Sequence, residues 1–338
     1  MTGQYELIAI GNPLLDMQAR DGGEELLKKA NDAILAGPEH MPIYKDVAEN
    51  HQVTYIAGGA SQNAARCAQY VLPANSTAYF GAVGEDDLAQ QQRSANEREG
   101  LKSVYQVIKG TPTGSCAVVI TGHHRSLCTN LGAAEKFTKD HLETAEAQQL
   151  IKGAKYAYME GYFLTHGLES AMILAKHAAE NKQIFSINIS APFIAQFFSA
   201  QLDEILPYSS LVFGNETEAE AYAEAHKLPN TKDLAAIAQH IADSPNKSAA
   251  KRTVIITHGA EPTILAQEGG KETKTFPVQK VEDIVDTNGA GDAFAGGVLG
   301  ASVAGKSIEE AISVGQKLGA MCIGQNGPVL AFPKQKVM

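Results

Sequence analysis

Cysteine is scarce in this sequence, which excludes two classes of protein. The 338 residues include only four cysteines, and no two of them form a C-x-x-C pair. So few cysteines in so long a chain exclude a disulfide framework, and we expect reduced thiols in the cytoplasm, with the nucleus as a second location. His123, His124 and Cys128 lie close together, but no fourth zinc ligand is apparent and Arg125 stands among them. A structural zinc site is therefore disfavoured.

Basic clusters and long apolar runs are also missing. The formal net charge is −10, and the sequence contains no block of lysine and arginine residues. A general basic surface for nucleic acid or anionic membrane is thereby excluded, so any phosphate site must be local. No stretch of about 18 apolar residues is present and the first residues lack a basic region, so we expect neither a membrane span nor a signal peptide. We expect small-molecule ligands and a monomer.

Apolar runs alternate with helical patterns along the chain. From residue 137 onward, helical segments separate short apolar runs at 156–159, 184–187, 211–213 and 254–257. Such alternation predicts parallel strands joined by right-handed crossovers. Further strands are predicted at 7–10, 53–57, 77–84, 103–108, 115–121, 125–130, 263–267 and 273–278, with a strand region ending near Val285, and a polar helical region at 21–50. Ligands of an open parallel sheet bind beyond the carboxyl ends of its strands. Side chains that follow these runs should therefore converge.

One stretch carries most of the chemical information, Asp286 to Gly297 with the sequence DTNGAGDAFAGG. Apolar residues with helical spacing follow it, so Gly289, Ala290 and Gly291 should lie at a helix N-terminus. Amide groups there have no partner inside the helix and bind anions, and small side chains let a phosphate come close. A carboxylate beside such a site, Asp292, is suited to removing a proton from a hydroxyl that attacks the phosphate. The alternative is a glycine-rich turn with an aspartate cap.

Two other motifs have both a functional and a structural interpretation. Gly58-Gly59 precedes a predicted helix that begins near Asn63, either as a second close approach to a ligand or as a simple strand–helix turn. Asn215 and Glu218 lie one helical turn apart and could hold water around Mg²⁺. They could equally form a capping box, and the two roles can coexist.

Seven motifs in order resemble the ribokinase/PfkB kinase family, and within it the kinases that act on adenosine. They are GNPLLD at 11–16, AGG at 57–59, TGSCA at 113–117, RSL at 125–127, SAPF at 190–193, GNETE at 214–218 and the stretch at 286–297. The resemblance implies an α/β fold, a ribokinase-like three-layer sandwich with a mostly parallel central sheet and a small α/β lid. The core would comprise residues 1–12, 61–112 and 137–338, and the lid 13–60 and 113–136.

The resemblance also implies a reaction, transfer of the γ-phosphoryl group of ATP to the 5′-hydroxyl of adenosine. Asp292 would be the general base, with the amides of Gly289 to Gly291 and the side chain of Arg125 stabilising the transferred group. Mg²⁺ would be organised through Asn215 and Glu218. The residues implied to hold the nucleoside are Asn12, Leu14, Asp16, Leu35, Gly58, Gly59, Asn63, Cys116, Leu131 and Phe163. Those implied to hold ATP are Asn215, Thr257, His258, Gly259, Asn288, Gly289 and Gly291.

Each of these residues also has an ordinary structural explanation. Leucine, phenylalanine and Cys116 are core residues by default, Asp16 could be a turn residue, Arg125 a solvated side chain and His258 part of a strand-end turn. A sugar kinase of the same fold is the main rival, because Asp16 and Asn63 suit any vicinal diol. A catalytically silent nucleotide-binding regulator would not need Asp292. A nicotinamide dehydrogenase is disfavoured because no G-x-G-x-x-G follows the first strand.

Overall fold

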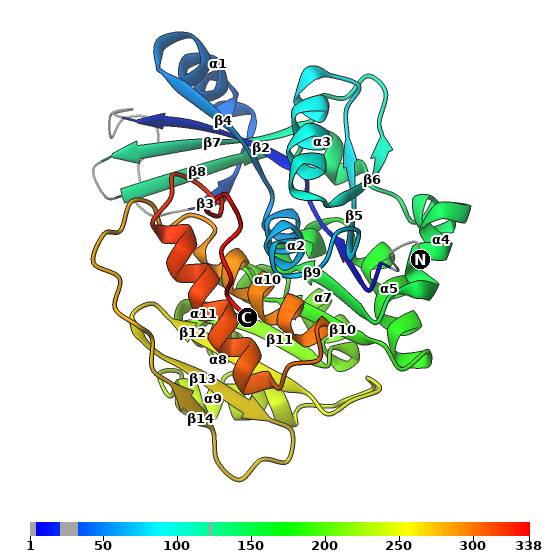
Figure 1. Cartoon of the computed structure of the whole chain (residues 1–338), viewed down its shortest axis with the longest axis vertical. Helices are drawn as coiled ribbons and strands as arrows, with labels where there is room; N and C mark the ends of the chain where they lie inside the picture. The colour runs from blue at the N-terminus through cyan, green and yellow to red at the C-terminus, as the bar shows by residue number, and fades with distance from the viewer. Residues whose placement is uncertain (1–4, 21–32, 122–123) are drawn as a thin grey trace.

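Two β-sheets organise the structure, a computed structural model that describes residues 5–20, 33–121 and 124–338. The larger sheet has nine strands in the order β14-β13-β12-β11-β10-β9-β1-β5-β6 (Figure 1). Neighbours from β12 to β6 pair in parallel, and β13 and β14 add antiparallel pairs at one edge. Its strands are β1 (Leu7–Ile10), β5 (Thr77–Val83), β6 (Lys102–Val107), β9 (Tyr156–Glu160), β10 (Ile184–Asn188), β11 (Leu211–Asn215), β12 (Thr253–His258), β13 (Glu261–Gln267) and β14 (Lys274–Phe276).

Helices cover both faces of this sheet, which makes three layers. Successive residues of β1 belong to different cores, Leu7 and Ala9 to one and Ile8 and Ile10 to the other, as expected of a parallel strand buried on both faces. One face packs against α2 (Ala60–Val71), α3 (Asp87–Glu99), α10 (Ala290–Val303) and α11 (Ile308–Ile323). The other packs against α4 (Ala145–Gly153), α5 (Leu168–Glu180), α6 (Pro192–Phe197), α7 (Ser199–Ile205), α8 (Glu216–Ala225) and α9 (Leu234–Asp243). The three-layer α/β class expected from the sequence is confirmed.

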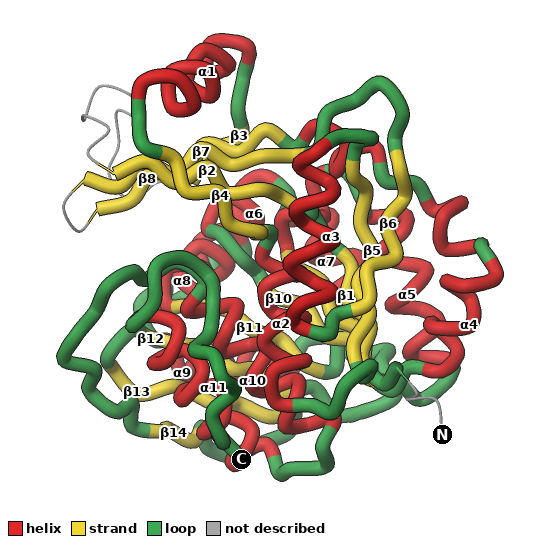
Figure 2. The backbone as a smooth tube through the Cα atoms, turned by 45° about the horizontal axis from the view of Figure 1, so that its top comes forward, coloured by secondary structure: helices red, strands yellow, loops and turns green. Residues whose placement is uncertain are grey.

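The smaller sheet has five strands in the order β3-β8-β7-β2-β4 and lies beyond one end of the core (Figures 1 and 2). Its strands are β2 (Leu14–Arg20), β3 (Ala33–Leu35), β4 (Val53–Gly58), β7 (Gly114–Thr121) and β8 (His124–Asn130). Helix α1 (Met41–Asn50) packs on it through Ile43 and Val47. All five strands fall within the two segments, 13–60 and 113–136, that the resemblance assigns to a lid.

Two local predictions differ from the structure. Within 21–50 the described residues, which begin at 33, form the strand β3, a short 3₁₀ turn at Pro38–His40 and the helix α1, so a strand stands at 33–35 where a helix was predicted. The strand predicted at 273–278 is present as β14, but the strand region expected to end near Val285 is not, because residues 277–289 contain no helix or strand. Pro277 has no N–H to continue the ladder, and Ile284 and Val285 are about half exposed, 54% and 53%.

Residues 324–338 return from the end of α11 along α2 (Figure 1). The hydroxyl of Tyr70 on α2 donates to the carbonyl of Ala331 at 2.9 Å and accepts from the amide of Gln335 at 2.6 Å. At the other end of this segment, the amide of Gly327 donates to Oδ2 of Asp286 at 2.9 Å. The segment at 324–338 therefore contacts both α2 and the loop that carries the DTNGAGD motif.

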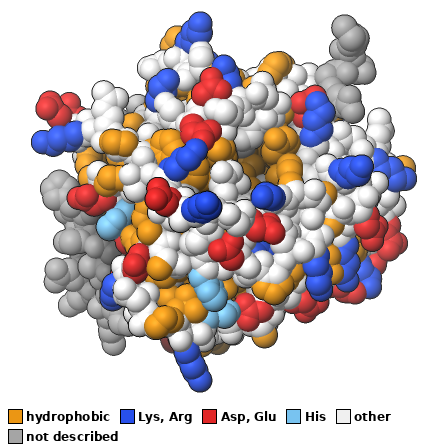
Figure 3. Space-filling model, turned by 90° about the horizontal axis from the view of Figure 1, so that it is seen from below, with side chains coloured by type: hydrophobic (Ala, Val, Ile, Leu, Met, Phe, Trp, Pro, Cys, Tyr) orange, Lys and Arg blue, Asp and Glu red, His pale blue; other side chains and the backbone are white. Residues whose placement is uncertain are grey.

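The surface agrees with the charge pattern of the sequence. On the face seen from below, basic and acidic side chains are interspersed among the described residues (Figure 3). Across the described parts of the chain, no helix combines the length and the apolar character that crossing a membrane requires.

Candidate active site

A cavity of about 840 Å³ lies at the carboxyl ends of the parallel strands, where the five-stranded sheet covers them. Both sheets contribute to its wall, as does the N-terminus of α10. Most of the residues singled out from the sequence line it. They are Asn12, Leu14, Asp16, Leu35, Gly59, Asn63, Cys116, Leu131, Asn215, Glu218, Thr257, Gly259, Asn288, Gly289, Ala290, Gly291 and Asp292. Segments far apart in the sequence thus meet at one place.

The first turn of α10 forms part of the wall of this cavity, from Gly289 to Asp292. Gly289 is the N-cap, with φ of 76°, a conformation that favours glycine. A Cβ atom at Gly289 would lie 2.8 Å from Cα of Pro328, whereas a Cβ at Gly291 would meet nothing within 4 Å. The side of the turn that faces the cavity is therefore open to a ligand. Amides at a helix N-terminus with such an open approach bind anionic groups well.

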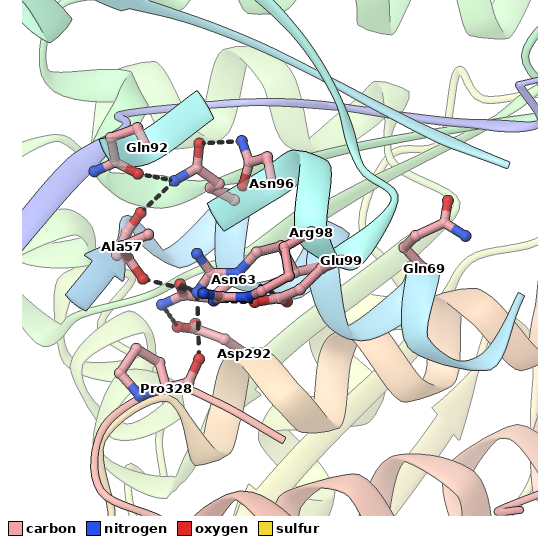
Figure 4. Close-up of polar contacts among 12 residues, drawn as sticks. Ala57, Asn63, Gln69, Gln92, Asn96, Arg98, Glu99, Asp292 and Pro328 are labelled. Atoms are coloured by element: carbon pink, nitrogen blue, oxygen red, sulfur yellow. Dashed lines mark hydrogen bonds and ion pairs between the residues drawn. The ribbon is translucent and has the colours of Figure 1, made fainter. Parts of the chain in front are cut away.

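Asp292 lies in that first turn, half-buried, and is held by a chain of polar contacts (Figure 4). Nδ2 of Asn63 donates to its Oδ2 at 2.9 Å, and the guanidinium of Arg66 donates to Oδ1 of Asn63 at 2.8 Å. Burial raises the pKa of Asp292 to about 6, while the bond from Asn63 and the charge of Arg66 pull it down. The carboxylate is therefore ionised at neutral pH and close to the pKa that suits a general base.

Arg66 itself is buried and has four partners. Besides Asn63, it donates to the carbonyls of Ala57 at 2.7 Å and Pro328 at 3.3 Å, and its Nε lies 3.4 Å from Glu99. These contacts fix the guanidinium between β4, the C-terminal segment and α3. The amide of Asn63 is oriented by it, with oxygen toward Arg66 and nitrogen toward Asp292.

Glu160, at the end of β9, is a second buried carboxyl group of the cavity. Its Oε1 accepts from the amide of Asn12 at 2.8 Å and its Oε2 from the amide of Ser61 at 2.5 Å. Burial raises its pKa to about 8, with repulsion from Asp292 acting in the same direction and the two amides opposing it.

Asn215 and Glu218 form a complete capping box at the start of α8. Oδ1 of Asn215 accepts from the amide of Glu218 at 2.9 Å, and Oε2 of Glu218 accepts from the amide of Asn215 at 3.0 Å. Both side chains also line the cavity. Burial, and to a lesser degree repulsion from Glu216 and Asp292, raises the pKa of Glu218 to about 7. The capping box at the start of α8 is therefore formed, and both side chains are still placed to hold a hydrated cation in the cavity.

A divalent cation fits this set of donors. Three carboxyl groups that line one cavity, Glu160, Glu218 and Asp292, all have raised pKa values, and repulsion from Asp292 contributes to the first two. A nearby cation would relieve that repulsion and the cost of burial. No group of three or more His, Cys, Asp or Glu residues among the described residues has the arrangement of a direct metal site. Mg²⁺, which usually keeps several water ligands, suits such an arrangement.

The opposite wall of the cavity combines one carboxylate with apolar side chains. Asp16 on β2 is buried, and Nδ2 of Asn288 donates to its Oδ2 at 3.4 Å, which joins the five-stranded sheet to the loop before α10. Leu14, Leu35 and Leu131 lie around it. Cys116 completes this wall, and its sulfur accepts from the hydroxyl of Thr129 at 3.3 Å. Such a wall suits a flat apolar ring attached to a group with hydroxyls.

Four of the implied residues are placed differently or lie outside the description. Phe163 is fully buried, 0% exposed, and packs against Phe137 and His166 in the core; its neighbour Tyr162 lines the cavity instead. The assignment of Phe163 to the apolar slot is therefore corrected. Gly58 and His258 belong to β4 and β12 but are not part of the cavity wall, unlike Gly59 and Gly259 beside them. The side chain of Arg125 and residue His123 lie outside the description, and with them the disfavoured zinc site.

The sequence reasoning missed Glu160, Asn188 and Arg66. Glu160 and Asn188 follow the apolar runs of β9 and β10, as Asn215 follows the run of β11, so the rule that flagged Asn215 applies to them equally. Both line the cavity. Arg66 has no such signal, because it does not follow an apolar run and its partner Pro328 is distant in the sequence.

Comparison with known proteins adds the decisive observation. The model of the pfkB family of carbohydrate kinases matches residues 28–335. The chain belongs to the pfkB family. It is also 50% identical to an adenosine kinase of Schizophyllum commune, with 99% of each chain covered, and 45% identical to an adenosine kinase of Saccharomyces cerevisiae, with 98% of each covered. The pfkB kinase is therefore a phosphotransferase, as the motifs implied.

Solved structures agree with the fold of this pfkB kinase. It resembles Anopheles gambiae adenosine kinase in complex with P1,P4-di(adenosine-5) tetraphosphate, with a TM-score of 0.93, 40% identity and 97% of each chain covered. It resembles Schistosoma mansoni adenosine kinase in complex with 2-fluoroadenosine, with a TM-score of 0.92, 33% identity and 98% of each chain covered. The ribokinase-like fold is thereby confirmed.

Proposed function

We propose that this protein is an adenosine kinase, which transfers the γ-phosphoryl group of ATP to the 5′-hydroxyl of adenosine and releases AMP and ADP. The observation that carries the proposal is the position of Asp292. Its carboxylate lies in the first turn of α10, beside amides suited to phosphate, in the same cavity as Asp16 and the apolar wall. The relatives named adenosine kinase, at 40–50% identity over nearly the full chain, support the choice of substrate.

Asp292 supplies the base. Its carboxylate, ionised at neutral pH, accepts the proton of the 5′-hydroxyl as that oxygen attacks the terminal phosphoryl group. The bond from Asn63 leaves one carboxylate oxygen, Oδ1, for the substrate. Charge that develops on the phosphoryl oxygens meets the amides of Gly289, Ala290 and Gly291, which are fixed before the reaction begins.

Other residues orient the two substrates. Asp16 can accept from two vicinal ribose hydroxyls, and Asn12, Gly59 and Asn63 lie along the same part of the wall. Thr257, Gly259 and Asn288 lie on the other side, where ATP would bind. The protein forms no bond to the transferred group, so positioning contributes a large share of the rate. Closure of the five-stranded sheet over the cavity would exclude water.

Asn215 and Glu218 are the residues we assign to Mg²⁺, through water molecules. Held there, the ion would neutralise charge on the triphosphate. Because Oε2 of Glu218 already accepts the amide of Asn215, the capping box orients the carboxylate toward the cavity. We also expect the protein to act as a monomer in a reducing cytoplasm, and the absence of a disulfide among its four cysteines supports the choice of compartment.

The test is a replacement of the base. Asp292→Asn should keep the fold and the melting temperature but lower turnover with adenosine by roughly 10²-fold or more, the scale of a general base. ADP release and circular dichroism measure the two effects. A folded variant with near-normal turnover would refute the assignment.

A sugar kinase of the same family is the second candidate, and the cavity wall decides against it. Leu14, Leu35 and Leu131 stand where a sugar would need hydrogen-bond partners. A panel of adenosine, other nucleosides, ribose and fructose with ATP and Mg²⁺ discriminates directly. Faster turnover of a free sugar than of adenosine would reverse the order of the candidates.

A further inference from the structure

Glu160 joins two places where the chain passes between the two sheets. Asn12 lies in the connection from β1 of the core to β2 of the five-stranded sheet, and Ser61 lies just after β4 returns to α2. The amides of both residues donate to the one carboxyl group, at 2.8 and 2.5 Å. Glu160 is the last residue of β9, in the middle of the nine-stranded sheet, and its backbone is paired there with Asn188 of β10.

The surroundings leave this carboxyl group little freedom. It is 1% exposed. A Cβ atom at Gly11 would collide with the carboxyl group, so the glycine is what allows the carboxyl group to approach the chain there. The hydroxyl of Ser61 donates to the carbonyl of Ile10 at 2.8 Å, which joins the two crossing segments to each other as well.

A second acidic residue, Asp86, binds the backbone at another place where the chain passes from the core to the five-stranded sheet. It accepts from the amide and the hydroxyl of Thr113, at 2.7 and 2.6 Å, at the point where the chain enters β7. The amide of Ala133, where the chain leaves β8, donates to Pro112 beside it at 2.8 Å. Glu160 contributes to the cavity wall, whereas Asp86 does not and also caps α3 by accepting from the amide of Ala89.

We propose that Glu160 is a positioning residue for the nucleoside, which acts by fixing the backbone of both crossings next to the substrate-binding residues. Asn12 and Gly59 lie at these crossings, and Asn63, which holds Asp292, lies two residues beyond Ser61 on α2. The side chain of Asn12 is aligned by a further contact, 2.9 Å between its Oδ1 and Nε2 of His166. The inference deepens the proposed function and rests on it.

Only a group with two acceptor oxygens satisfies both amides. In Glu160→Gln, one oxygen remains and an NH₂ group faces the other amide, so one of the two bonds must be lost although the shape is kept. In Glu160→Asp, both acceptors remain but the side chain is one methylene shorter and cannot reach both amides. Asp86→Asn makes the same chemical change at the crossing that lies away from the cavity wall, and is the matched comparison.

Steady-state kinetics and hydrogen exchange test the proposal together. In Glu160→Gln we expect KM for adenosine to rise about tenfold, the scale of one such bond, with KM for ATP changed less than about twofold. Glu160→Asp should change KM for adenosine in the same direction, whereas Asp86→Asn should leave that constant within about twofold of the original. In ligand-free protein, amide exchange should accelerate at Asn12 or Ser61 in Glu160→Gln and stay unchanged in α10.

The outcomes separate the two proposals. A wild-type protein that does not phosphorylate adenosine overturns the proposed function, while the exchange measurement still tests the role of Glu160 in fixing the backbone. A folded Glu160→Gln with unchanged exchange at both amides, or with unchanged KM for adenosine, overturns the inference. Equal increases in the KM values for adenosine and ATP, together with a lower melting temperature, would show a merely structural role and overturn it as well.

Discussion

Replacing Arg66 should shift the acidic limb of the pH–rate profile although Arg66 does not line the cavity. Its guanidinium donates to Asn63, which donates to Asp292, and its charge lowers the pKa of that carboxyl group. Arg66→Gln removes the charge and frees the amide of Asn63 to rotate. Both changes favour the protonated form of Asp292, so its pKa should rise.

The size of the shift follows from the contacts. A hydrogen bond to a charged group contributes about 1.5–3 kcal/mol, and partial loss of that bond with the charge gives about 1.4 kcal/mol, or one pKa unit. With the pKa of Asp292 rising from about 6 to about 7, the ionised fraction falls from about 50% to about 9% at pH 6 and from about 91% to about 50% at pH 7. The variant should therefore be about fivefold slower at pH 6, about twofold slower at pH 7 and unchanged near pH 9.

The assay is kcat/KM for adenosine between pH 5 and 9, because this ratio reports ionisations of the free enzyme. Arg66→Lys retains the charge and should shift the limb less. Arg98→Gln is the matched control, because Arg98 also contacts Glu99, at 3.5 Å, but is 71% exposed and does not touch Asn63. An acidic limb at the same pH in Arg66→Gln and in the unaltered protein would refute the relay through Asn63. A uniform loss at every pH would refute it too.

Three further predictions concern the helix ends and the cation. Gly289→Ala should lower the free energy of unfolding by about 1–3 kcal/mol, because φ is 76° and its Cβ would collide with Pro328, whereas Gly291→Ala should leave the melting temperature unchanged and raise KM for ATP by narrowing the phosphate approach. Thermal unfolding and initial rates distinguish the pair, and equal melting temperatures would contradict the first half. Asn215→Ala removes the cap of α8 and should cost about 1 kcal/mol of stability, while Asn215→Ser should restore the stability more than the activity. Chelation of divalent cations should abolish turnover without unfolding the protein, and Mg²⁺ should restore it; turnover that survives chelation would contradict the cation's role.

The core could be predicted from the sequence because each of its signals is local. The apolar runs at 156–159, 184–187 and 211–213 became β9, β10 and β11. The rule that ligands bind at the carboxyl ends of parallel strands correctly predicts the position of Asn215. The strand expected before Asp292 is absent, and Asp292 reaches the same cavity from the first turn of α10. The resemblance supplied the residues of the five-stranded sheet, such as Asp16 and Cys116, that periodicity alone would have assigned to turns or core.

The predictions that were wrong or missing concern residues whose surroundings are set by residues far away in the sequence. Apolar residues near Ile284 suggested a strand, but Pro277 interrupts the ladder and no partner strand covers that segment. Phe163 and Tyr162 are adjacent and both aromatic, and only the packing of Phe137 and His166 around Phe163 determines which one faces the cavity. Arg66 could not be identified because its partner Pro328 is 262 residues away in the chain.

The contacts of residues 327–335 have a consequence for how the protein is made. Asp286 holds its loop through the amide of Gly327, and Arg66 reaches the carbonyl of Pro328. A ribosome has synthesised Asp292 and all of α10 well before it adds these residues. The nascent chain can therefore assemble its nine-stranded sheet while the loop before α10 still lacks its support, and we expect competence for phosphoryl transfer to appear only after residues 327–335 have been synthesised.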